Sequence, residues 1–231
     1  MSKAFVATLF AALIVGSAGA AETTRYIALV NSGKDRAGHQ TVTRNGDQYR
    51  VEYVFKDNGR GPELKEEYTV GADGTFTRYH VAGTSTFGSL VEETFSRSGD
   101  TVRWKSTSDK GEQAVQGAAL YSPLSGTPQT FSVLIAALAK RPDGKLPMIP
   151  SGTLTARTLA EAQVTRGAEK RTVRLIAFTG IGFTPLAVWA TTDSTPRLFA
   201  FVYPGYLQLI EEGWEKNGGA LEARQNTAEK E

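Results

Sequence analysis

Residue types suited to hydrolytic or metal chemistry are sparse in this sequence. Histidine occurs only as His39 and His80, and neither belongs to an H-x-H or H-E-x-x-H spacing that would place two imidazoles on one metal ion. Cysteine is absent, which excludes thiolate metal ligands and disulfides. We therefore predict no metal site and no cofactor, and we interpret each histidine as a surface or pairing residue.

Paired carboxylates are the second chemistry to consider, and three glutamate pairs occur: Glu66-Glu67, Glu92-Glu93 and Glu211-Glu212. The first two pairs fall in predicted strands, where neighbouring side chains point to opposite faces, so neither pair forms a two-carboxylate site by itself. We interpret them as solvated strand edges. Hydroxyl residues are too numerous to be informative, and no G-x-S-x-G nucleophile motif is present. No catalytic residue is predicted.

The segment Asp57-Asn58-Gly59-Arg60-Gly61-Pro62 is the most distinctive short motif. It could present the Arg60 cation to an anionic partner. The alternative is a wide turn whose glycines serve the backbone, and we favour it because the dinucleotide and P-loop spacings are absent.

The elements that must position any site are mostly strands. Residues 48–56 alternate, with Tyr49, Val51, Tyr53 and Phe55 on one face, as a half-buried strand requires. Turn sequences such as Asn45-Gly46-Asp47 recur every 8 to 12 residues up to about residue 107, which predicts a meander of antiparallel hairpins. Strands are predicted again at 153–164, 172–179, 186–191 and 197–203, and the last two are apolar on both faces, which favours a central position.

Two segments have helical spacing. Residues 128–140 follow Thr127 as a possible N-cap and carry Phe131, Leu134 and Leu138 on one face. Residues 206–231 are predicted to form a helical connector or tail. The fold class predicted is therefore mainly β: an antiparallel curved sheet or incomplete β-barrel over residues 21–205, with one inserted helix and a helical C-terminal tail.

Residues 1–20 have the features of a cleavable signal peptide. Lys3 precedes a 12-residue apolar run over residues 4–15, and small residues precede Ala21. That run is shorter than the roughly 18 residues of a membrane-spanning helix, and no comparable run follows. Without Lys3 the remaining chain has 25 basic and 24 acidic residues, a net charge of +1, which gives no basis for binding nucleic acid. We expect an exported protein, periplasmic or extracellular, without a transmembrane segment.

Aromatic residues are frequent in the second half of the chain, which suggests either a ligand cavity or an ordinary packed core. For the cavity we predict Trp189, Phe199 and Phe201 as ligand-binding residues. For contact with a partner protein we predict a separate stripe: Leu207, Ile210 and Trp214.

Several stretches resemble the N-terminal β-rich region of exported bacterial amidohydrolase-superfamily proteins. They are KDRAGHQ at 34–40, DNGRGPELKE at 57–66, YHVAGTSTFG at 79–88, ALAKRPDGKLP at 137–147, WATT at 189–192, PRLFA at 196–200 and IEEGWE at 210–215. In that family the metal-binding residues lie in a following barrel, and no position here matches their motif. The resemblance implies a non-catalytic accessory module that works with an amidohydrolase catalytic domain in cis or in trans.

Two other functions stay open at this stage. The domain could be a binding module in which the curved sheet holds a lipid or another apolar ligand, with the inserted helix as a lid. It could also be a scaffold or envelope protein with neither ligand nor enzyme partner.

Overall fold

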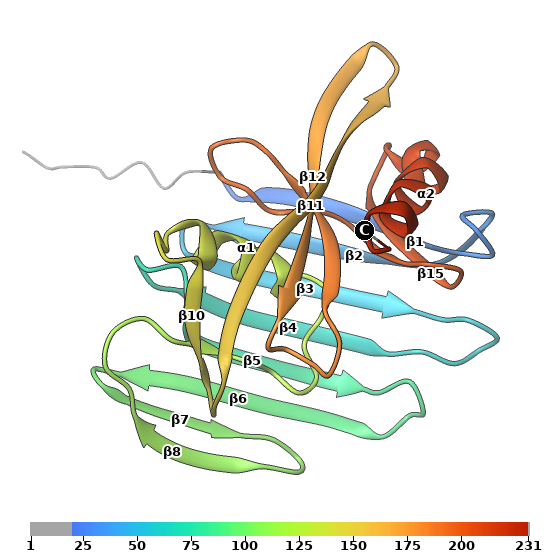
Figure 1. The fold of residues 1–231 in the computed structure, drawn as a ribbon. Coiled ribbons are helices and arrows are strands. Elements are labelled where there is room, and N and C mark those ends of the chain that lie inside the picture. The colour runs from blue at the N-terminus through green and yellow to red at the C-terminus, as the bar shows by residue number, and fades with distance from the viewer. Residues whose placement is uncertain (1–19, 231) are drawn as a thin grey trace, which may run out of the picture.

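The computed structural model describes residues 20–230, and it confirms a mainly β fold (Figure 1). Fifteen strands form one sheet in the order β8-β7-β6-β5-β4-β3-β2-β1-β15-β14-β13-β12-β11-β10-β9. Neighbouring strands pair antiparallel except β9 and β10, which are parallel. The edge strands β8 and β9 do not pair with each other among the described residues, so the sheet is curved but unclosed.

The first half of the sheet is the predicted meander. Its strands are β1 (Glu22–Val30), β2 (Asp35–Asn45), β3 (Gln48–Phe55), β4 (Glu63–Val70), β5 (Phe76–Thr84), β6 (Leu90–Ser98), β7 (Thr101–Lys105) and β8 (Lys110–Ala114). In β3 the alternation has the predicted consequence, because Val51, Tyr53 and Phe55 are buried on the concave face. This face forms the floor of the interior.

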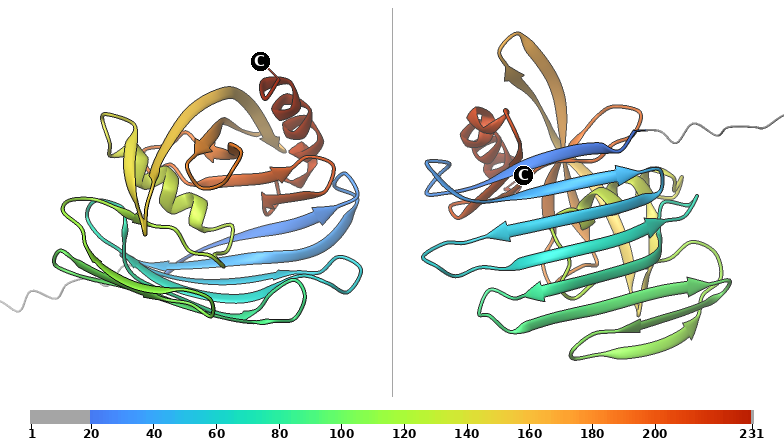
Figure 2. Two further views of the ribbon diagram at one scale, coloured as in Figure 1. Left: turned by 60° about the horizontal axis from the view of Figure 1, so that its bottom comes forward. Right: turned by 180° about the vertical axis from the view of Figure 1, so that it is seen from behind.

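The second half folds back over that floor. It comprises β9 (Leu120–Tyr121), α1 (Thr130–Ala139), β10 (Lys145–Ile149), β11 (Thr153–Arg166), β12 (Glu169–Thr179), β13 (Leu186–Thr191), β14 (Leu198–Tyr203), β15 (Leu207–Glu211), the 3-10 turn Glu215–Asn217 and α2 (Gly218–Ala228). The left view of Figure 2 shows α1 lying between the two halves of the curved sheet. The inserted helix is therefore an interior element.

The C-terminal segment differs from the prediction of a continuous helical tail. Residues 207–211 form strand β15, which pairs with β1 on one side and β14 on the other, so that Ile210 lies opposite both Ile27 and Ala200. Two ladders of backbone hydrogen bonds outweigh the helical spacing of Leu207, Ile210 and Trp214, which is too short to specify a helix alone. The helix begins only at Gly218.

A second hydrophobic core lies on the convex face of the sheet. There α2 covers Trp189, Phe199 and Ile210, all of them completely buried, through contacts that include Leu221. Strands β13 and β14 are thus covered by α1 on one face and by the second core, to which β11 and α2 contribute, on the other. This arrangement confirms the central position predicted from their two-sided apolar pattern.

Within residues 20–230, no helix has the length and apolar character needed to cross a membrane. The same part of the chain contains no group of three or more histidine, aspartate or glutamate side chains placed to hold a metal ion.

Candidate ligand-binding pocket

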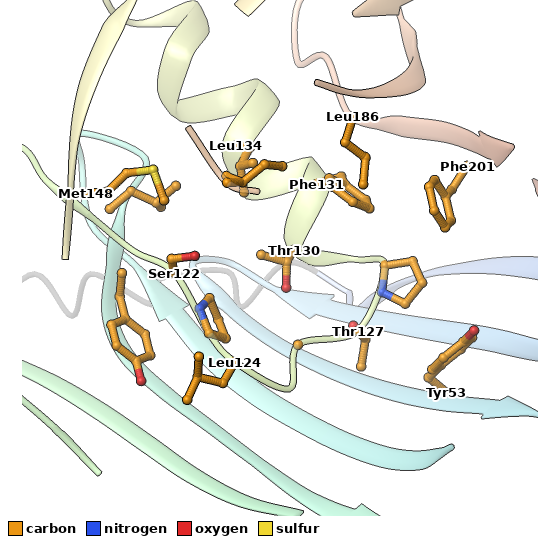
Figure 3. Close-up of a pocket in the computed structure, with 16 residues that line it drawn as sticks. Tyr53, Ser122, Leu124, Thr127, Thr130, Phe131, Leu134, Met148, Leu186 and Phe201 are labelled. Atoms are coloured by element: carbon orange, nitrogen blue, oxygen red, sulfur yellow. The ribbon is translucent and has the colours of Figure 1, made fainter. Parts of the chain in front are cut away.

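A pocket of about 380 Å³ lies between the concave face of the sheet and α1 (Figure 3). Its walls come from both halves of the fold, including the first turns of α1. The apolar lining includes Leu120, Leu134, Met148, Ile181, Leu186 and Phe201. The hydroxyl groups in the lining belong to Tyr53, Tyr121, Ser122, Thr127 and Thr130. No charged side chain is among the described residues that line it.

One wall of the pocket is the segment that links β9 to α1, residues 122–129, which we call the strap. It contains no regular secondary structure beyond a turn and crosses the concave face of the first half of the sheet (Figure 3). A loop buried against a sheet must find partners for its backbone amides. Here the partners are two glutamates.

Glu93 on β6 holds the first part of the strap. Its Oε1 accepts hydrogen bonds from the Tyr121 hydroxyl at 2.6 Å and the Leu124 amide at 2.9 Å. Its Oε2 accepts from the Leu124 and Ser125 amides at 3.1 and 3.0 Å. The Glu93 side chain is 1 % exposed; its bond to Tyr121 is buried, and its bonds to the two amides are partly buried.

Glu66 on β4 holds the end of the strap. Its Oε2 accepts from the Thr127 amide at 2.8 Å and from the Tyr79 hydroxyl at 3.4 Å. Burial of this fully covered carboxyl raises its pKa to about 7, against the lowering effect of these hydrogen bonds. The nearby Glu93 also raises the pKa of Glu66.

The two glutamates come together because of strand register. Val81 on β5 pairs with Glu66 on β4 and with Glu93 on β6, so both carboxyls point into the interior on either side of one residue. Aromatic rings pack beside them: Phe95 stacks on Tyr121 at 4.5 Å between ring centroids. Burial and the hydrogen bond to Glu93 raise the pKa of Tyr121, which keeps its hydroxyl a donor.

The interpretation of the glutamate pairs as solvated edges was therefore wrong for one member of each pair. Glu66 and Glu93 are fully buried and Glu211 nearly so, with the last bonded to Arg171 and Arg197 at 2.8 and 2.7 Å. The alternation of side chains along the two strands indicates that Glu66 and Glu93 are buried. Glu66 lies between Leu64 and Tyr68 at inward positions, and Glu93 likewise between Val91 and Phe95, so each shares the face of apolar neighbours.

The three predicted ligand-binding residues are not brought together. Phe201 lines the pocket, whereas Trp189 and Phe199 lie in the second core on the other side of the sheet. A β-bulge is responsible: Trp189 pairs with Ala200 and Ala190 with Leu198, which leaves Phe199 as the extra residue. The extra residue changes the face on which the following side chains fall, so Phe199 and Phe201 point to opposite sides.

The predicted partner-contact stripe lies inside the protein. Leu207, Ile210 and Trp214 are 7 %, 0 % and 0 % exposed. Trp214 lies under the guanidinium groups of Arg166 and Arg171, at 4.9 and 4.4 Å from its ring centroid. Leu207 packs in the first core, and contact of Trp214 with another protein would require these arginines to move away.

The remaining motifs have structural roles. His80 pairs with Glu92 at 2.8 Å on the outer face, and His39 is partly exposed on β2. In the loop after β3, Asp57 and Arg60 exchange backbone hydrogen bonds. Gly61 has φ of 149°, and a Cβ there would lie 2.0 Å from the Phe55 carbonyl oxygen. The glycines therefore serve the turn, as we favoured.

The fold and pocket define a β-barrel-like protein with an unclosed sheet. No family model matches the chain, and no curated protein matches it. Its fold is similar to a solved structure from Brucella abortus, described as a β-barrel-like protein of the domain of unknown function DUF1849. The two share 9 % sequence identity with a TM-score of 0.50, over 82 % of this chain and 94 % of that one. At this identity the similarity shows the fold alone.

These comparisons correct the resemblance drawn from short sequence stretches. The structural neighbour is a β-barrel-like protein, and nothing links this chain to the N-terminal region of an amidohydrolase. The stretches quoted for the resemblance largely cover turns and strand ends, such as the hairpin loop 57–62 and the turn 85–88, whose residues follow from backbone geometry.

Proposed function

We propose that this chain is a non-catalytic binding module that holds a small, mainly apolar ligand in the pocket beneath the strap. The observation that carries the proposal is the construction of this wall: a loop without regular structure, fastened over the concave face by two buried carboxyls. The volume of about 380 Å³ is in the usual range for small-molecule sites, about 300–1,000 Å³.

The energetics of the strap support a binding role. Burying a carboxyl is costly, and an apolar side chain of similar volume often serves stability as well or better. The two glutamates instead fix the strap at a defined position over the sheet, beside an apolar space lined by Phe131, Leu134 and Phe201. A pre-formed pocket of this kind reduces the entropy lost when a ligand binds.

The pocket can be tested with the neutral fluorescent probe N-phenyl-1-naphthylamine. Wild-type protein is expected to bind the probe with enhanced fluorescence. Leu186→Trp should weaken binding at least about tenfold, because the larger ring occupies apolar space otherwise taken by the probe. Fluorescence titration gives the dissociation constants.

Phe183→Trp is the matched control. Phe183 lies in the connection before β13, three residues from Leu186, but its side chain is fully exposed and it does not line the pocket. Its affinity for the probe should equal that of the wild type. Absence of binding by the wild type, or equal affinities for wild type and Leu186→Trp, would contradict the proposed function.

We also propose that the protein is exported. The predicted signal peptide over residues 1–20 lies almost entirely outside the described residues, and the first described strand begins at Glu22, directly after the expected cleavage point. Intact-mass measurement of the protein recovered from its cells is expected to give a chain that begins at Ala21. A chain that retains residues 1–20 would contradict export by this route.

A further inference from the structure

We propose that the ligand of this pocket is a neutral amphiphile, an apolar molecule with one uncharged oxygen-bearing group that accepts a hydrogen bond from Tyr53. This inference rests on the proposed function, and it specifies the chemical class of the ligand.

The first observation is the Tyr53 side chain. It is 6 % exposed, lines the pocket from β3 and lies on the opposite side from Leu134 in Figure 3. Its hydroxyl forms no hydrogen bond with another residue in the described part of the chain. Burial and the neighbouring Tyr206 raise the pKa of Tyr53, so the hydroxyl stays protonated as a donor. This oxygen is not among the buried atoms that lack a partner, so it is open to the pocket, and an oxygen on the ligand can accept its hydrogen bond in place of water.

The second observation is a polar group of α1 that lies under the strap, beside the same space. The Thr130 Oγ1 atom is buried and unpaired among the described residues, and Figure 3 shows it directed toward the strap. Gly126 leaves room beside it, because a Cβ at that position would lie 2.7 Å from this oxygen. Among the hydroxyl groups of the lining, those of Tyr121 and Thr127 already form hydrogen bonds within the protein, whereas that of Tyr53 does not.

The third observation is the sign of the surrounding charge. No cation lines the pocket among the described residues, and the carboxyls of Glu66 and Glu93 lie directly behind the strap, bonded to the amides of lining residues Thr127 and Leu124. A ligand carboxylate or phosphate would meet repulsion without a counter-ion. The geometry therefore favours an alcohol, phenol, amide or ester over a free acid.

Three probes of matched shape test this inference: 4-butyltoluene, 4-butylphenol and 4-butylbenzoate. At pH 8 the phenol is expected to bind about fivefold more tightly than the hydrocarbon, and the benzoate more weakly than either. Tyr53→Phe should remove the advantage of the phenol and leave the affinity for 4-butyltoluene unchanged. Isothermal titration calorimetry or ligand-detected NMR measures the three affinities.

Tyr49→Phe is the matched control, because Tyr49 lies on the same strand but lines a separate hollow on the other side of α1. It should keep the preference for the phenol. Equal binding of phenol and hydrocarbon by the wild type, a preference that survives Tyr53→Phe, or tight binding of the benzoate would overturn the inference while the proposed function stands. Failure of all three probes to bind would contradict the proposed function itself.

Discussion

Replacing Glu93 by alanine is expected to lower the free energy of unfolding by about 2–4 kcal/mol, since the change leaves one buried and two partly buried donors without an acceptor. Those donors are the Tyr121 hydroxyl and the amides of Leu124 and Ser125. The strap should detach from β6, so its amides should exchange with solvent much faster than those of β5. Urea unfolding and hydrogen exchange measured by mass spectrometry provide the two readouts.

Glu92→Ala is the control for this prediction. Glu92 is the adjacent residue on β6 but points outward, where it pairs with His80 at about half exposure of both side chains. Exposed pairs of this kind contribute about 0–1 kcal/mol, so the Glu92→Ala protein should be nearly as stable as the wild type and keep its strap protected. A Glu93→Ala protein as stable as Glu92→Ala would show that the strap is held by other contacts.

Probe binding extends the same experiment to function. Because Glu93 fixes one wall of the pocket, Glu93→Ala should also weaken the binding of N-phenyl-1-naphthylamine under conditions in which the protein remains folded. If the strap amides exchange faster in Glu93→Ala but the affinity for the probe is unchanged, the strap does not form part of the ligand site.

The sheet could be predicted from sequence because its signals are local. Turn residues such as Asn45-Gly46 and the alternation through β3 act over a few residues, and consecutive hairpins need no long-range information. The helical tail is confirmed from Gly218 onward, but its start at residues 207–211 was mispredicted because β15 depends on pairing with β1, some 180 residues earlier in the chain. The spacing of Leu207, Ile210 and Trp214 carries no information about which distant strand this segment pairs with.

The candidate site was less accessible to sequence reasoning. The alternation that places Glu66 and Glu93 on the apolar side of their strands is present in the sequence, although we interpreted both glutamate pairs as solvated edges. Most of their donors come from residues 121–127, a segment without a recognisable motif. The bulge at Phe199 likewise has no sequence signature, yet it decides that Phe201 faces the pocket and Phe199 does not. Side-chain direction after a bulge is a tertiary property.

Glu66→Gln is expected to remove a pH dependence of stability. The folded-state pKa of Glu66 is raised from 4.5 to about 7 by burial, so the folded protein binds this proton more tightly than the unfolded chain. The stability associated with that proton is fully present below pH 4.5 and is lost as the pH rises through 7. The wild type should therefore lose about 3 kcal/mol between pH 4.5 and 8 from this group.

The Glu66→Gln protein lacks this titrating group, so its free energy of unfolding should not fall between pH 4.5 and 8 for this reason. Relative to its value at low pH, its stability should therefore exceed that of the wild type by up to about 3 kcal/mol at pH 8, less any cost of burying the amide. Glu67→Gln is the control, because Glu67 is exposed beside Arg50 on the outer face. Urea unfolding at intervals from pH 4 to 8 measures all three proteins. An unchanged pH dependence in Glu66→Gln would contradict the assignment.

The same titration bears on ligand selection. Protonation of Glu66 removes one of the two negative charges behind the strap while leaving its oxygens bonded near Thr127. Rejection of 4-butylbenzoate by the wild type should therefore weaken from pH 8 to pH 6, whereas in Glu66→Gln it should stay constant, since the benzoate itself remains ionised over this range. Identical behaviour of the two proteins would show that the missing counter-ion, and not the carboxylate of Glu66, is responsible for excluding anions.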